Sequence, residues 1–196
     1  MGNTFNIYMT GVGGQGIGLL AELLARAVDH AGIAMKGCDT HGLAQRGGIV
    51  ASHLRLGEGA HSPLVEPGTA DLVVALERHE AIRGLRTMLS ASGTLVWYDA
   101  SWQPLPVRLR KAQPVEASEV LTEASGRGVA AVKVFLDGLD DPRKQNMVLA
   151  GELVARGLVP GVAMDHLRAA LGDLLDGPAL AENLALLERV GRGPQA

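Results

Sequence analysis

Hydrophobic and polar positions along this chain follow two different periods, and the switches between them predict alternating strands and helices. Residues 5–10 are rich in strand-forming side chains, and from Ile17 apolar residues recur at helical spacing until Gly32 closes the helix. Compact apolar runs predict further strands at residues 33–38, 49–56, 71–76, 94–98 and 130–135. Helical spacing predicts helices at residues 79–89 and 116–125.

The C-terminal part of the chain has a helical pattern throughout. From Arg143 onward apolar residues keep helical spacing, with a break at Pro160-Gly161, a helix over residues 164–175 and a last helix from Gly177 to Gly191. Residues 103–114 carry several prolines and basic side chains, which predict an irregular surface crossing with at most a short edge strand. We therefore expect a single domain over residues 1–196, of which residues 143–191 form a helical C-terminal segment.

The alternation of strands and helices favours one fold class. Such patterns are typical of an α/β fold with a doubly wound, mostly parallel, Rossmann-like sheet and helices on both faces. With 196 residues, of which 47% are hydrophobic and 20% charged, the chain is long enough to bury a full aliphatic core.

Composition and charge exclude several classes of partner. The formal net charge of −3 gives no reason to expect nucleic acid or an anionic membrane, and an aromatic content of 3% leaves no stacking platform for single strands. No apolar run approaches the roughly 18 residues that a membrane span needs. Because the N-terminus also lacks a basic leader segment, we expect a cytoplasmic protein.

The chain has one cysteine, Cys38, and this count limits its chemistry. A single thiol forms no internal disulfide, which favours a reducing compartment, and it cannot ligate an iron–sulfur cluster or a structural zinc ion by itself. The six histidines show no metal-ligand spacing, and His53, in the middle of a predicted strand, is interpreted as structural. We therefore assign this chain no metal site and no catalytic residue of its own.

A glycine-rich turn follows the first predicted strand and carries the first functional signal. Its pattern, Gly11-x-Gly13-x-x-Gly16, matches the dinucleotide fingerprint between a strand and a helix, where bare backbone N–H groups can approach a diphosphate. Asp39, at the end of the second predicted strand, stands where a ribose-binding acid is expected. Two interpretations stay open: the turn binds an anion or contacts a partner subunit, or its glycines serve only packing.

A second polar segment, His41-Gly42-Leu43-Ala44-Gln45-Arg46-Gly47-Gly48, is unusual for a dinucleotide-binding domain. Arg46 precedes two glycines, so its guanidinium could hold a carboxylate or phosphate through two parallel hydrogen bonds. The alternative is an internal ion pair between Arg46 and Asp39 or Glu77.

Together the two segments resemble a known family. Gly11-Val12-Gly13-Gly14-Gln15-Gly16 and the segment from His41 to Gly48 are similar to the small (beta) subunit of indolepyruvate:ferredoxin oxidoreductases and to the gamma-subunit domain of pyruvate and other 2-oxoacid:ferredoxin oxidoreductases. Residues 70–77 and 146–151 extend the resemblance, which covers residue 5 to about 191. His41 with Gln45-Arg46 resembles the indolepyruvate branch more than the pyruvate branch.

The resemblance implies an enzyme subunit that is inactive alone. The family couples coenzyme A-dependent oxidative decarboxylation of a 2-oxoacid to reduction of ferredoxin, and it needs thiamine diphosphate and 4Fe–4S clusters. The thiamine motif is absent here, which places these centres on a large catalytic partner subunit, with ferredoxin reached through the complex. This chain would supply a docking surface and a coenzyme A site built from the following residues: Gly11, Gly13, Gly14, Gln15, Gly16, His41, Gln45, Arg46, Gly47 and Gly48.

Other interpretations of the sequence stay open. The chain could be the gamma subunit for pyruvate or another 2-oxoacid, or a free-standing NAD-binding oxidoreductase or regulator, and in isolation it could form a homodimer. Predicted strands end in Asp39, Glu77, Asp99 and Asp137, near the edge where such sheets bind ligands. These carboxylates would repel a phosphate unless cations such as Arg46 or Arg78 offset them.

Overall fold

The computed structural model describes residues 4–41, 48–102, 107, 109–110 and 113–191. Within these ranges six strands form one sheet: β1 Phe5–Val12, β2 Met35–His41, β3 Ile49–Leu56, β4 Ala70–Ala75, β5 Leu89–Tyr98 and β6 Ala130–Val134. The helices are α1 Ile17–His30, α2 Arg78–Thr87, α4 Ala117–Gly126, a short 3-10 turn Pro142–Lys144, α5 Gln145–Ala155, α6 Met164–Leu174 and α7 Gly177–Gly191.

The sheet is mostly parallel, as the sequence predicts. Its order is β2-β3-β1-β4-β5-β6, and β1, β4, β5 and β6 run parallel to one another. Only β3 runs the opposite way, antiparallel to both β1 and β2. The reason lies in the connection: residues 42–48 join β2 to β3, and a parallel crossover needs a dozen residues or more.

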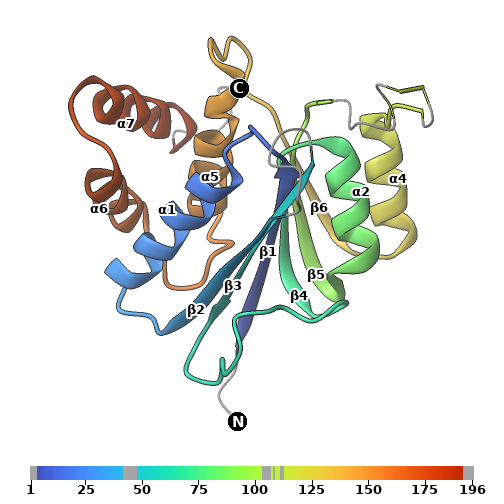
Figure 1. Ribbon diagram of the computed structural model, residues 1–196, viewed down its shortest axis with the longest axis horizontal. Helices are drawn as coiled ribbons and strands as arrows, with labels where there is room; N and C mark the ends of the chain where they lie inside the picture. The colour runs from blue at the N-terminus through green and yellow to red at the C-terminus, as the bar shows by residue number, and fades with distance from the viewer. Residues whose placement is uncertain (1–3, 42–47, 103–106, 108, 111–112, 192–196) are drawn as a thin grey trace.

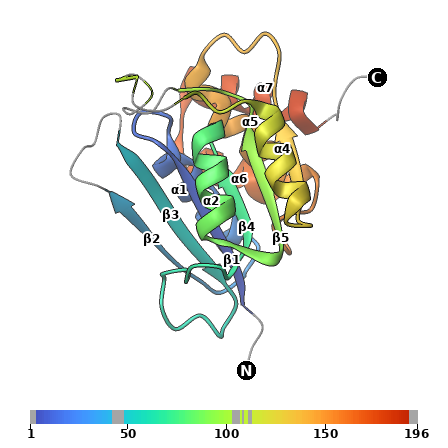
Figure 2. The ribbon, with the colours of Figure 1, turned by 90° about the vertical axis from the view of Figure 1, so that its right-hand side faces the viewer.

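Helices cover both faces of the sheet, which confirms the doubly wound architecture. Figure 1 shows α1, α5, α6 and α7 on one side of the sheet and α2 with α4 on the other. In the second view β2 and β3 extend beyond the edge of α2 (Figure 2). The carboxyl ends of the parallel strands therefore meet at one edge, from which the chain leaves toward either helical layer.

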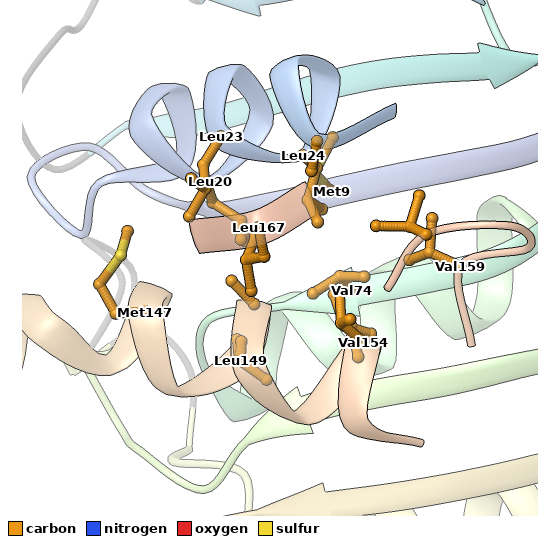
Figure 3. Packing of buried hydrophobic residues seen from close by; sticks show 14 of the residues in the cluster. Met9, Leu20, Leu23, Leu24, Val74, Met147, Leu149, Val154, Val159 and Leu167 are labelled. Atoms are coloured by element: carbon orange, nitrogen blue, oxygen red, sulfur yellow. The ribbon is translucent and has the colours of Figure 1, made fainter. Parts of the chain in front are cut away.

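The larger of two buried clusters lies between the sheet and the four-helix layer. Leu20, Leu23 and Leu24 of α1 are fully buried and lie beside Met9 of β1 and Leu167 of α6 (Figure 3). Each such side chain contributes about 1.5–3 kcal/mol of transfer free energy on burial. The helical spacing that begins at Ile17 thus describes the inward face of α1.

The predicted start of one strand is wrong. Strand β5 begins at Leu89 and not at Thr94: Leu89 pairs with Ala70 and Thr94 pairs with Leu72, so the strand continues although its register with β4 shifts between these two pairs. A Cβ atom at Gly93 would lie 2.7 Å from the carbonyl oxygen of Ala70, so glycine at this position lets β5 lie against β4.

Among the described residues, no helix is both long and apolar enough to cross a membrane.

Candidate functional site

The glycine turn lies at the topological switch point of the sheet. From β1 the chain turns into α1 on one face, whereas from the neighbouring strand β4 it turns into α2 on the other face. Open α/β sheets bind ligands at this point. A groove of about 420 Å³ opens there, lined by Val12, Gly13, Gly14, Gly16, Ile17, Gly18 and Val50.

The turn presents main-chain N–H groups to this groove. Gly16 is the N-cap of α1 and adopts the left-handed conformation with φ 82°, and no side chain of the described residues caps the helix. The N–H groups of Gly16, Ile17 and Gly18 donate to no acceptor among the described residues. Because a helix N-terminus also carries partial positive charge, this arrangement favours an anion such as a phosphate.

The structure brings the two sequence motifs together. The N–H of Gly13 donates to the carbonyl oxygen of Gly48 at 2.8 Å. In the sheet, His41 pairs with Val50, which in turn pairs with Gly11, so the segment that starts at His41 leaves the sheet at the same edge as the glycine turn. Residues 42–47, which include Gln45, Arg46 and Gly47, lie outside the described residues, as does the placement of the His41 side chain.

The buried side chain of Gln15 stabilises the turn through two hydrogen bonds to the main chain. Its side chain is fully buried: Oε1 accepts from the N–H of Val12 at 2.7 Å, and Nε2 donates to the carbonyl oxygen of Leu76 at 3.0 Å. The first bond closes the turn on β1, and the second ties it to the end of β4. Gln15 therefore shapes the turn, and its amide does not reach the groove.

Gly11 and Gly18 differ in the space beside their Cα atoms: the first is crowded and the second is open. A Cβ atom at Gly11 would lie 2.9 Å from Cγ1 of Ile17, so this glycine serves packing between β1 and α1. At Gly18 a Cβ atom would meet no described residue within 4 Å, although glycine in a helix costs about 1 kcal/mol relative to alanine. Sequence analysis missed Gly18, although it extends the glycine spacing by two residues into the helix.

Asn146 is a second residue that sequence analysis did not assign to the site. It lies in the first turn of α5, is 3% exposed, and its Nδ2 donates to the carbonyl oxygen of Gly16 at 3.2 Å. The signal in the sequence is weak: two buried polar residues, Gln145 and Asn146, open a helix in which every other residue except Glu152 is apolar or glycine.

Asp39 does not occupy the place of a ribose-binding acid. It lies on β2 and pairs with Ser52, and β3 separates β2 from β1. Two interstrand spacings put Asp39 roughly 10 Å from β1. The free-standing NAD-binding interpretation thereby loses the carboxylate on which it rests.

A buried carboxylate pair lies behind the turn, on the side of α2. Glu77 follows β4 and caps α2: Oε1 accepts from the N–H of Glu80 at 2.5 Å, whereas Oε2 is buried and has no hydrogen-bond partner among the described residues. Burial raises the pKa of Glu77 to about 7, because main-chain hydrogen bonds only partly offset the lost hydration. Burial raises the pKa of Glu80 as well, although ion pairing with Arg83 and a hydrogen bond from Thr10 oppose the shift.

A third strand-end carboxylate is neutralised within the chain. Nε of Arg78 lies 2.6 Å from Oδ1 of Asp99, and Nζ of Lys133 lies 3.6 Å from Oδ2. The repulsion that the sequence predicts at this edge is therefore reduced, because Asp99 is paired and Glu77 is half protonated near neutral pH.

The described part of the chain contains no cluster of three or more His, Cys, Asp or Glu side chains that could hold a metal ion. Cys38 is half-buried on β2, and burial together with Asp39 raises the pKa of its thiol. His53 is buried and its Nδ1 accepts from the N–H of Val65 at 3.1 Å, as expected of a structural histidine.

The fold and the site together define a doubly wound α/β domain that presents main-chain N–H groups at its switch point. The chain belongs to the pyruvate ferredoxin/flavodoxin oxidoreductase family, whose model matches residues 6–192. It is 30% identical over 188 residues to the indolepyruvate oxidoreductase subunit IorB of Archaeoglobus fulgidus, an alignment that covers 93% of this chain and 92% of that protein. The resemblance stated from the motifs is thus confirmed.

Solved structures share the fold. A keto/oxoacid ferredoxin oxidoreductase gamma subunit from Geobacter sulfurreducens superposes with a TM-score of 0.65 at 17% identity and covers 96% of both chains. The 2-oxoglutarate:ferredoxin oxidoreductase from Magnetococcus marinus, solved with 2-oxoglutarate, coenzyme A and succinyl-CoA, superposes with a TM-score of 0.68 at 19% identity. In that structure the match covers 96% of this chain but 31% of the other, so the shared fold is one part of a longer polypeptide.

Proposed function

We propose that this chain is the small subunit of a 2-oxoacid:ferredoxin oxidoreductase that acts on indolepyruvate or a related arylpyruvate. The observation that carries the proposal is the glycine turn, whose N–H groups face a groove and have no acceptor among the described residues. The chain that contains this turn is similar over almost its whole length to an IorB subunit. With one cysteine, the chain has too few thiolates for an iron–sulfur cluster of its own.

The electron-transfer chemistry then belongs to a partner. Thiamine diphosphate and the 4Fe–4S clusters would lie on a large catalytic subunit, and ferredoxin would receive electrons from the assembled complex. In the Magnetococcus enzyme the shared fold is continuous with a longer chain, which supports a permanent contact between this domain and the remainder of the enzyme. Without the partner we expect no oxidation of any 2-oxoacid.

The contribution of this chain would be to hold coenzyme A. The N–H groups of Gly14, Gly16, Ile17 and Gly18 would bind a phosphate of the diphosphate, and Val12 and Val50 would contact an adjacent apolar portion. Arg46, in the segment that joins β2 to β3, would add a guanidinium. The proposed site otherwise consists of Gly11, Gly13, Gln15, His41, Gln45, Gly47 and Gly48. Of these, Gly11 and Gln15 shape the turn, and Gly48 accepts a hydrogen bond from it.

Co-expression with a large thiamine- and iron-containing subunit tests the proposal. We expect the two chains to purify together and to reduce ferredoxin with an arylpyruvate only when coenzyme A is present. A panel of 2-oxoacids, including pyruvate, then identifies the substrate branch. If the isolated chain instead binds NAD with micromolar affinity, or oxidises a substrate alone, the proposal is wrong.

Gly18→Ala tests the groove. A methyl group at residue 18 would project into space that no described residue occupies, and it would meet a bound phosphate. The KM for coenzyme A in the complex should therefore rise about 10-fold, the loss expected for one hydrogen bond to a charged group. Gly172→Ala in α6 is the matched control, because Gly172 is also helical and its Cβ position is also open. Both variants should stabilise the fold by about 0.5–1 kcal/mol, and only Gly18→Ala should change the KM. Equal KM values would exclude the groove as the coenzyme A site.

A further inference from the structure

Asn146 links α5 to the glycine turn across a sequence separation of 130 residues. Its Oδ1 accepts from the N–H of Met147 at 2.8 Å, and its Nδ2 donates to the carbonyl oxygen of Gly16 at 3.2 Å. Both ends of the buried amide are therefore satisfied within the chain. The side-by-side packing of α1 and α5 in Figure 1 makes this reach possible.

The bond from Asn146 acts on the peptide group that points toward the groove. The carbonyl of Gly16 and the N–H of Ile17 belong to one planar peptide unit, so fixing the oxygen also fixes the direction of the N–H. The same oxygen accepts the first helical bond of α1, from the N–H of Leu20 at 3.0 Å. Two donors on this oxygen polarise the peptide, which strengthens its N–H as a donor to an anion.

Packing adds a second constraint at the same place. A Cβ atom at residue 16 would lie 2.5 Å from Nδ2 of Asn146, so the amide occupies the space beside Gly16 that any other residue would need. Asn146 thus lies directly beside the left-handed N-cap of α1, whereas no described residue lies within 4 Å of the Cβ positions of the groove residues Gly14 and Gly18.

We propose that Asn146 is a positioning residue for the anion site: it does not touch the ligand but orients the Gly16–Ile17 peptide that binds phosphate. This inference rests on the proposed function of the glycine turn as the coenzyme A diphosphate site. It assigns to α5, in the helical C-terminal segment, a role in ligand binding at the N-terminal turn.

The test uses the assembled complex and two variants at one position. Asn146→Ala removes both hydrogen bonds, and Asn146→Asp keeps the volume and the acceptor for the N–H of Met147 but removes the donor to Gly16. We expect both variants to raise the KM for coenzyme A about 10-fold while kcat at saturating coenzyme A stays unchanged. The matched control is Asn183→Ala, because Nδ2 of Asn183 in α7 donates to the carbonyl oxygen of Ala179 at 2.8 Å at an exposed position far from the turn in sequence.

A pH profile separates orientation from loss of packing. The carboxyl group introduced by Asn146→Asp can donate to the Gly16 oxygen only when protonated. Because residue 146 is buried, the pKa of the introduced carboxyl group should be raised, and we expect the ratio of variant KM to wild-type KM to fall as the pH is lowered from 8 to 5. The ratio for Asn146→Ala should stay constant. A constant ratio for both variants would show that the hydrogen bond is unimportant.

The outcomes distinguish this inference from the proposed function. If Asn146 variants keep the wild-type KM while Gly18→Ala raises it, the positioning role is wrong and the coenzyme A site stands. If neither Gly18→Ala nor the Asn146 variants change the KM, the proposed coenzyme A site is wrong, and the positioning role of Asn146, which depends on that site, is wrong as well. Failure of both Asn146 variants to assemble would also overturn the inference, because a positioning residue should leave the complex intact.

Discussion

The substitution Glu77→Gln is expected to raise the free energy of unfolding of the isolated chain more at pH 8 than at pH 5. The difference between the two effects, each taken relative to the wild type, should be on the order of 2–3 kcal/mol. Glu77 is fully buried at the N-terminus of α2, and burial raises its pKa from 4.5 to about 7. Between these two values the folded state binds a proton that the unfolded state has released. The stability of the wild type therefore falls as the pH rises from about 4.5 to about 7, and it stays low above that window.

The amide of the Gln variant does not ionise, so this fall in stability should be absent. Its carbonyl oxygen can still accept from the N–H of Glu80, which preserves the cap of α2. Glu80, whose pKa burial also raises, contributes a further slope that both proteins share. Urea unfolding at pH 5, 6, 7 and 8 measures the difference.

Glu58→Gln serves as the control for this titration, because Glu58 is exposed on the turn after β3. It should follow the wild-type profile at every pH. Parallel profiles for Glu77→Gln and the wild type would mean that Glu77 is hydrated in solution and that its burial is wrong.

The elements of the fold could be predicted because each has a strong local pattern. The inward face of α1, with Leu20 and Leu24, repeats at helical spacing. The antiparallel pairing of β2 with β3 is not predicted, because the apolar run of the second strand ends at residue 38 and the structure extends this strand to His41. The place of β3 between β1 and β2 is a different matter. The position of β3 depends on long-range pairing that the sequence does not reveal. If β3 is left out, β2 is placed next to β1 and Asp39 flanks β1, as in a nucleotide-binding fold.

The candidate site was predictable only where it is local. The strand, the glycine turn and the helix that follows are contiguous, so Gly13 and Gly16 carry their own signal. From the sequence, Gln15 is expected to bind the ligand. The sequence does not reveal that main-chain groups of Val12 and Leu76 use both ends of its amide. Asn146 approaches the turn from 130 residues away, and no periodicity connects it to Gly16.

Gly16→Ala is expected to destabilise the chain by about 3 kcal/mol, through two separable causes. An alanine in the left-handed conformation costs roughly 1–2 kcal/mol, and Gly16 has φ 82°. The added methyl group would also lie 2.5 Å from Nδ2 of Asn146, so the buried amide must move and lose its bond to the Gly16 oxygen, at a further cost of about 1–3 kcal/mol. Chemical unfolding of the isolated chain measures the total.

Gly32→Ala isolates the first cause, because Gly32 follows the other end of α1 with φ 68° and a Cβ atom there would meet nothing within 4 Å. It should cost only the conformational part, roughly 1–2 kcal/mol. The second cause appears in a double-mutant cycle: once Gly16→Ala has displaced the amide, Asn146→Ala should cost at least about 1 kcal/mol less than it does in the wild type. Additive effects would mean that Asn146 and Gly16 do not interact, and the orientation of the Ile17 N–H would then need another cause.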